Sequence, residues 1–258
     1  MKAHQTILST ENCLAAIEKH SRGLAEAARG HLDAPVEHCP GWSVADLVWH
    51  VAQVHWFWGT IAEERLSSPP HESRRPSRPT DEELVDAFEA GARRLVEVLR
   101  NADQSAACWT WAPGQQDVAF VTRHQVQEAV VHHWDAANAT GQRLQIGADV
   151  AADSVDEFLT FSVSSDIDPA TATDDKPLPL PLTATFALVA TDANRSWTIS
   201  DGSTPSTLSV KEGQADETPA IRATATDLLL WLYNRVTLEP GDVPLEIIER
   251  FRGLCFTD

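Results

Sequence analysis

The sequence is poor in basic residues and contains no long hydrophobic run. It has 20 lysine and arginine residues against 38 aspartate and glutamate residues, which gives a formal net charge of −18. An acidic surface repels nucleic acid and anionic lipid, so we expect neither as a partner. No apolar stretch reaches the ~18 residues that a membrane-spanning helix requires, and residues 1–8 carry no signal-peptide core. The sequence therefore predicts a cytoplasmic protein, with a monomer as the default state.

Cysteine, tyrosine and methionine are scarce as well. Four cysteines are scattered along the chain without a C-x-x-C pair, and there is one tyrosine and one methionine. In a chain of this size without a signal peptide, we expect reduced thiols rather than a disulfide framework. Tryptophan is abundant instead, with nine copies, which suits large and rigid core filling.

Hydrophobic residues spaced three or four apart predict helices throughout the first half of the chain. The predicted helices run from Thr10 to near Gly30, from Ser43 through Trp58, from Thr80 through Leu99 and from about Asp117 to Thr140. Ser43 with Asp46 is close to a capping-box pattern, and Thr80 with Glu83 matches it better.

The second half of the chain has a different character. One more helix is predicted near Ala151–Val163, and a strongly apolar helix near Thr226–Val236. Between them lie strand-like runs at Leu182–Thr191, Arg195–Ser200 and Thr207–Val210, separated by turn signals. The fold class is therefore α+β, with a helical bundle over residues 1–145 and a small α+β domain over residues 146–258.

The predicted fourth helix carries the residues with the most specific chemistry. His124, Glu128 and His132 recur every four residues, so they share one helix face. Imidazole nitrogen and carboxylate oxygen are suitable zinc ligands. Two ligands do not hold zinc alone, so a third is expected from a neighbouring helix, with a fourth position for water or substrate. The alternative is a solvated helix face.

The predicted second helix offers two histidines. His50 lies on the apolar stripe, where it needs a partner, and a metal ion or a backbone carbonyl would serve. His55 is five residues on, about 140° further round the helix, so both cannot easily serve one site. On the fourth helix, Asp135 could orient a ligand histidine or be a surface acid, and His133 points away from His132.

Three stretches resemble the mycothiol-dependent maleylpyruvate isomerase family, which belongs to the larger DinB-like group of metalloenzymes. They are Cys39–Ala52 (CPGWSVADLVWHVA), Gln127–Ala136 (QEAVVHHWDA) and Ala225–Arg235 (ATDLLLWLYNR). They occur in the order typical of the family and span nearly the whole chain. The resemblance implies a DinB-like four-helix bundle followed by the α+β C-terminal domain of this family.

The resemblance also implies a ligand set and a cofactor. His50, Glu128 and His132 would hold one metal ion, Zn²⁺ or another divalent metal, while His124 is not a ligand in the family pattern. Two departures stand out, because His133 replaces a common arginine and Asn234 replaces a common glycine. Arginine binds a carboxylate bidentately and histidine does not, so the first change either alters the substrate or is a surface change without consequence.

By this resemblance, the protein is a metal-dependent isomerase or S-transferase that uses a low-molecular-weight thiol, mycothiol, on a small electrophilic substrate. A thiol that coordinates a metal is deprotonated, and the thiolate is the nucleophile. Arg235 is a candidate for binding an anionic group, or else it complements the end of a helix dipole. The alternatives are a zinc hydrolase of a small ester or amide and a non-enzymatic protein that binds a metal or a ligand.

Overall fold

The computed structural model describes residues 8–112, 114–163, 178–204, 206–213 and 217–256. The chain divides into two compact units, Met1–Ile146 and Gly147–Asp258. The sequence placed the boundary one residue earlier. Within the described ranges, no helix is both long and apolar enough to cross a membrane.

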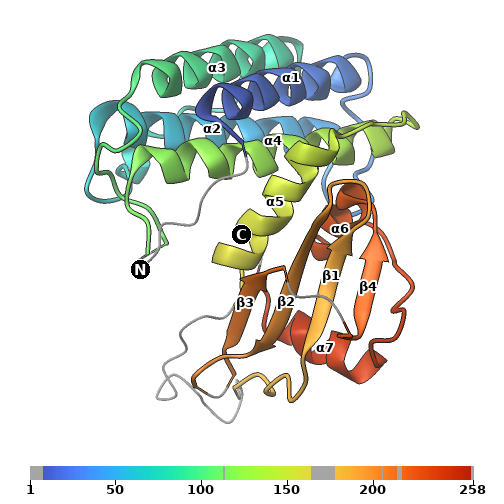
Figure 1. Ribbon diagram of the computed structural model, residues 1–258. Helices are drawn as coiled ribbons and strands as arrows, with labels where there is room; N and C mark the ends of the chain where they lie inside the picture. The colour runs from blue at the N-terminus through green and yellow to red at the C-terminus, as the bar shows by residue number, and fades with distance from the viewer. Residues whose placement is uncertain (1–7, 113, 164–177, 205, 214–216, 257–258) are drawn as a thin grey trace. The chain divides into compact units, whose positions relative to one another are not determined.

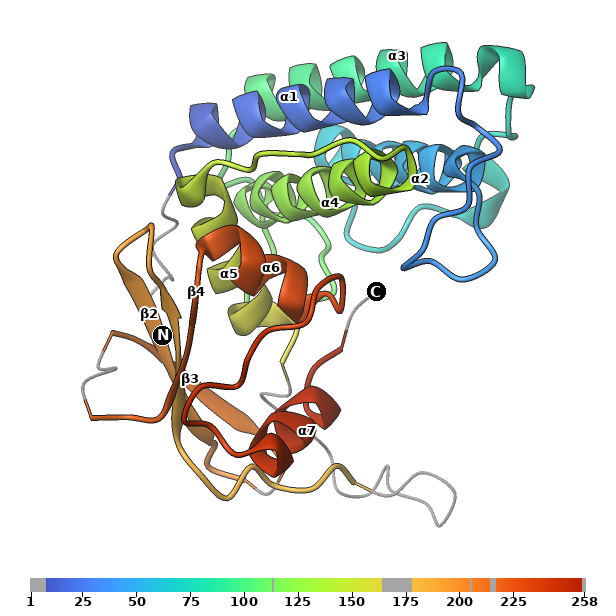
Figure 2. The same ribbon diagram turned by 90° about the vertical axis from the view of Figure 1, so that its right-hand side faces the viewer.

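The first unit is a bundle of long helices (Figure 1). Its elements are α1 (Thr10–Ala28), α2 (Val44–Glu64), the short 3-10 helix η1 (Glu72–Arg74), α3 (Asp81–Asn101) and α4 (Val118–Ala139). In both views α1 and α3 form one layer, and α2 and α4 form the other (Figures 1 and 2). The four α-helices match the four predicted helices, and η1 was not predicted.

Side-chain contacts give the direction in which each helix runs. Asp46 pairs with Arg78 just before α3, and Glu63 near the end of α2 pairs with Arg94 on α3, so α2 and α3 are parallel. The long connection over residues 65–80 makes this arrangement possible. Between α2 and α4, the ring of His50 contacts His132 and that of Trp58 contacts His124, so these two helices are antiparallel.

The two predicted capping boxes have different outcomes. Ser43 Oγ accepts a hydrogen bond from the Asp46 amide at 3.3 Å, and the Asp46 carboxylate accepts one from the Ser43 amide at 3.0 Å. The hydrogen bond from the Ser43 amide, followed by one that the Ser43 hydroxyl donates to the Asp46 carboxylate, lowers the pKa of Asp46. The better-matching pair fails as a box, because the Thr80 hydroxyl donates to the Glu83 carboxylate and makes no cap hydrogen bond.

The second unit combines helices with a small sheet. Its elements are α5 (Ala148–Phe161), β1 (Phe186–Ala190), β2 (Arg195–Asp201), β3 (Leu208–Glu212), β4 (Ala220–Ala223), α6 (Ala225–Leu232) and α7 (Leu245–Gly253). The strand order is β3-β2-β1-β4, with β1 antiparallel to β2 and parallel to β4. Helices α5 and α6 pack together (Figure 2).

The α+β class predicted from the sequence is confirmed, but two elements of the second unit were missed. Strand β4 has four residues, Ala220–Ala223, which do not alternate between apolar and polar. Helix α7 follows Pro244 and buries Phe251 alone among its side chains, so its hydrophobic stripe is incomplete. Helix α6 ends at Leu232 rather than near Val236, because Asn234 has a left-handed backbone with φ of 60°.

Candidate metal centre

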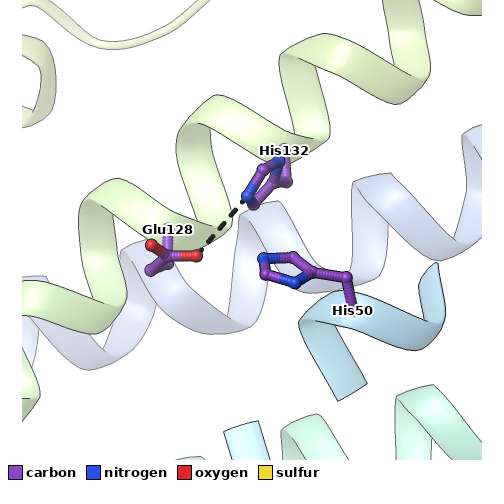
Figure 3. A group of neighbouring side chains, drawn as sticks. All are labelled: His50, Glu128 and His132. Carbon is purple, nitrogen blue, oxygen red and sulfur yellow. Dashed lines mark ion pairs between the residues drawn. The ribbon is translucent and has the colours of Figure 1, made fainter. Parts of the chain in front are cut away.

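His50, Glu128 and His132 converge between α2 and α4 (Figure 3). Their ligand atoms all lie within 4.8 Å of one another, and this is the one such group of three or more potential ligands among the described residues. His132 Nε2 lies 3.5 Å from Glu128 Oε2. The rings of His50 and His132 are edge to face, with centroids 5.1 Å apart.

Asp135 fixes the orientation of His132. The Asp135 carboxylate accepts a hydrogen bond from His132 Nδ1 at 3.0 Å, and its side chain is fully buried. Because an ionised carboxylate can only accept, the proton of a neutral His132 ring resides on Nδ1. The lone pair of Nε2 is therefore free to face Glu128, as in histidines that bind metal ions. The burial of Asp135 excludes the surface-acid alternative.

The centre favours a cation. Glu128 Oε2 is buried and has no hydrogen-bond partner within the part of the chain that the structure describes. Burial alone would raise the pKa of Glu128, but four surrounding histidines outweigh it, His132 first, and hold this pKa below its ordinary value. Burial, followed by the nearby His132, lowers the pKa of His50, so the His50 ring is neutral at neutral pH. An orphaned carboxylate oxygen beside imidazole nitrogens is suited to a divalent metal ion.

Trp42 lies next to the candidate metal centre, although the sequence did not single it out as a site residue. Its ring lies 5.0 Å from that of His50, centroid to centroid, at an interplanar angle of 53°. Trp42 is held there by the tight turn before α2, where its amide donates to the Cys39 carbonyl and Val36 donates to the Trp42 carbonyl. The tryptophan thus covers one ring of the site and restricts its rotation.

His124 lies outside the three-residue group. Its ring stacks on Phe120 at 5.4 Å and contacts Trp58 and Trp111 edge to face. Gln127 Nε2 lies 3.3 Å from His124 Nδ1. The four-residue spacing that suggested a ligand thus places this histidine in an aromatic cluster, one turn before Glu128.

His133 faces away from His132, toward α1. Its Nδ1 lies 3.1 Å from Nδ1 of His20, a buried residue that sequence reasoning missed. Burial lowers the pKa of His20 to about 3 and that of His133 to about 4. The His133 ring lies over Gly23, where an added Cβ would approach it to 2.2 Å. His133 is therefore packed between helices, and its replacement of the family arginine is not a surface change.

Arg235 lies in the second unit, just after α6. Its guanidinium donates to the carbonyl of Tyr233 at 2.7 Å, and its amide donates to the carbonyl of Leu230. Asn234 before it has a φ of 60°, a conformation in which glycine and asparagine are the usual residues. The departure from the family glycine at this position therefore preserves the backbone turn.

Two family models match the chain in order. The "Mycothiol maleylpyruvate isomerase N-terminal domain" matches residues 13–137, and the "MDMPI C-terminal domain" matches residues 149–246. Among solved structures, the mycothiol-dependent maleylpyruvate isomerase is similar, with a TM-score of 0.56 and 14% sequence identity over 93% of this chain and 98% of the other. At that identity the likeness shows the fold. No protein of curated function matches.

Proposed function

The chain belongs to the mycothiol maleylpyruvate isomerase family, and from this premise we propose that it is a metal-dependent enzyme using mycothiol as a thiol cosubstrate. The observation that carries the proposal is the convergence of His50, Glu128 and His132, whose ligand atoms lie within 4.8 Å of one another. The similar solved structure is that of a mycothiol-dependent maleylpyruvate isomerase. We propose an isomerase or S-transferase acting on a small electrophile.

The three side chains would act as ligands rather than as acids or bases. Two imidazoles and one carboxylate are a common ligand set for catalytic zinc, with a further position open to a reactant. A divalent metal ion bound there would lower the pKa of a coordinating thiol and so supply the nucleophile at neutral pH. Zinc is the first candidate, although nickel, cobalt or iron also suit this set.

The protein's own contribution is orientation and a restricted environment. Asp135 holds His132 with Nε2 facing the centre, and Trp42 packs against His50. For isomerisation, the thiolate adds to an activated carbon–carbon double bond, rotation follows about the resulting single bond, and the thiolate leaves with the pair of electrons it donated. The cosubstrate is regenerated, so no oxidant or reductant is needed. An anion-binding role for Arg235 is a separate part of the proposal.

The first test is metal content. The protein would be purified without a metal-binding tag and analysed for elements, wild type beside His50→Ala and His132→Ala. Close to one equivalent of zinc in the wild type and loss in both variants is the expected result. No metal in the wild type, even after zinc is added, would overturn the proposal.

The second test is thiol dependence. The metal-loaded protein would be assayed on small activated alkenes with and without mycothiol. Turnover that requires the thiol is expected, and His132→Ala should abolish it. Turnover of the alkenes that persists after all low-molecular-weight thiol is removed would overturn the thiol dependence. Cleavage of a small ester or amide by the thiol-free protein would instead indicate a hydrolase.

A further inference from the structure

Among the described residues of the bundle helices, buried polar atoms without a hydrogen-bond partner lie on Ser21 of α1 and on three side chains of α2 and α4. His55 and Gln125 are 1% and 0% exposed, and both polar atoms of each lack a partner among the described residues. Glu128 Oε2, the candidate metal-binding oxygen, is the third. Leaving such groups unpaired costs free energy, so native proteins pair them with protein atoms, ions or ordered water.

The helix register places these groups near one another. The ring contacts of His50 with His132 and of Trp58 with His124 set α2 antiparallel to α4, which puts Val54 level with Glu128. His55 follows Val54 directly. Its ring stacks on Phe88 of α3 at 5.6 Å, so it points into the bundle interior. Glu128 acts on the pKa of His55 more strongly than any other nearby charge, as expected for close neighbours.

Gln125 reaches the same region from α4. It precedes Glu128 by three residues and His132 by seven, so the three side chains project from one helix face. Gln125 therefore lies one turn before Glu128 along α4, and the register of the two helices sets His55 at a level between them. A donor and an acceptor from each of His55 and Gln125 thus face the interior behind the candidate ligands.

We propose that His55 and Gln125 bind ordered water behind the candidate metal centre, and that this water positions the Glu128 carboxylate. Buried water commonly makes about three hydrogen bonds to polar groups that are otherwise unpaired. A neutral imidazole and a carboxamide each supply a donor and an acceptor, and an ionised carboxylate oxygen has lone pairs for a metal ion and for a water donor at once.

Other ways of using these groups fit less well. His55 is outside the group whose ligand atoms lie within 4.8 Å of one another in the described chain, so it does not act as a fourth direct ligand. Burial, the largest cause, lowers the pKa of His55 to about 4, so it is neutral at physiological pH and offers no charge to an anionic substrate. Water can pair with neutral donors and neutral acceptors alike. His55 and Gln125 would then act on Glu128 through this water, as positioning residues.

The water is tested by a high-resolution crystal structure of the full metal-free protein. We expect ordered water within about 3.2 Å of a His55 ring nitrogen and of the Gln125 amide, with a further hydrogen bond to Glu128. A dry interior around His55 and Gln125 would overturn the proposal. This measurement does not depend on metal binding, so it still decides if the wild type proves to bind no zinc and the proposed function fails.

The positioning role rests on the proposed metal site and is tested by zinc affinity, measured by competition with a chromophoric chelator. His55→Phe keeps the stacking on Phe88, and Gln125→Met keeps the side-chain length, but each removes the polar atoms. Each variant should weaken zinc binding about tenfold. Both changes disrupt one shared water site, so their effects should not add. The zinc affinity of the double variant should be close to that of the single variant that binds zinc more weakly.

The matched control is Ile17→Val, which removes one methyl group from a fully buried side chain of α1. It should lower the thermal midpoint slightly and leave zinc affinity unchanged. If His55→Phe and Gln125→Met raised the midpoint and left zinc affinity unchanged, the groups would be unpaired without consequence for Glu128, and the positioning role would be wrong. An equal loss of zinc affinity in Ile17→Val would also overturn the positioning role.

Discussion

His132 and His133 are adjacent on α4 but belong to two different clusters. His132 shares its surroundings with a carboxylate and is oriented by a second one, Asp135. His133 meets another imidazole, His20, whose Nδ1 lies 3.1 Å from its own. Two neutral imidazoles satisfy each other as donor and acceptor. The histidine pair is thus complete without a cation, whereas the cluster with Glu128 keeps an oxygen without a hydrogen-bond partner among the described residues.

The difference shows what distinguishes a packed histidine from a candidate ligand. Burial lowers the pKa of His20, His50 and His133 alike, so neutral imidazole is available in both clusters. Only the first cluster adds an anion, and a bound cation would balance that charge. We therefore expect changes at the first cluster to alter metal binding and changes at the second to alter stability.

Removing the anion should have the largest effect. Glu128→Gln keeps the size of the side chain but removes its charge and one strong ligand oxygen, so zinc affinity should fall by more than about 100-fold. Isothermal titration with zinc measures this directly. In the wild type, zinc should also raise the thermal midpoint, since it binds the folded state, and Glu128→Gln should lose that increase.

The matched variant for this comparison is His133→Phe, which changes the other cluster on the same helix. Its zinc affinity should stay close to that of the wild type. If Glu128→Gln bound zinc normally, or if His133→Phe lost it equally, the distinction between the two clusters would fail.

The sequence predicted the elements that carry the candidate centre because their hydrophobic stripes are regular. His50 was identified as a candidate ligand because it interrupts the apolar stripe of α2. The spacing on α4 could not decide between His124 and His132, since each is four residues from Glu128. The decision came from the family resemblance. In the structure, antiparallel α2 brings His50 to His132 and Trp58 to His124, which favours His132 as the candidate ligand.

Other features depend on contacts that no local pattern carries. The pairing of His20 with His133 joins residues on α1 and α4, and the pattern of neither helix indicates its partner on the other. The failed capping box at Thr80 has a similar cause. The pattern there is better than at Ser43, but the Thr80 hydroxyl donates to Glu83 instead of accepting from the helix backbone.

A smaller loss of metal affinity is expected when the orientation of His132 is weakened. Asp135→Asn keeps the shape of the buried side chain but replaces a charged acceptor with a neutral one. The hydrogen bond to His132 Nδ1 becomes weaker, and zinc affinity should fall by about 10-fold to 100-fold. Chelator competition measures the change. An affinity equal to that of the wild type would mean that packing alone, including that of Trp42, orients the ring.

The second cluster should make stability depend on pH. Burial lowers the pKa of His20 to about 3, with His133 and Lys19 as further causes, from the ordinary value of 6.5. Below pH 6.5 the unfolded chain binds a proton at this histidine that the folded protein excludes. The free energy of unfolding therefore decreases as the pH is lowered below 6.5, and this contribution is fully present above 6.5. Urea unfolding of the metal-free protein between pH 7 and pH 4 measures this slope.

The variant His20→Phe should flatten that slope in part. It removes one group that the fold keeps neutral. His55 and His133, whose pKa values are also lowered to about 4, and His50, whose pKa is lowered, still contribute. The loss of unfolding free energy on acidification should therefore be smaller in the variant than in the wild type. An unchanged slope would show that His20 titrates normally and that the histidine pair opens before it is protonated.

The smallest expected effect separates packing from helix propensity at two glycines. Gly23 in α1 and Gly91 in α3 both lie inside helices, where alanine is favoured over glycine by about 1 kcal/mol. At Gly91 an added Cβ meets nothing within 4 Å, so Gly91→Ala should raise the free energy of unfolding by about 0.5–1 kcal/mol.

At Gly23 the same methyl group would lie 2.2 Å from the His133 ring. Gly23→Ala should therefore destabilise the bundle by about 1–3 kcal/mol despite the better propensity, while zinc affinity stays unchanged. Urea unfolding of both variants gives the two signs. Stabilisation by both substitutions would mean that the His133 ring moves away without cost, and the histidine pair would then not contribute to the packing of α1 against α4.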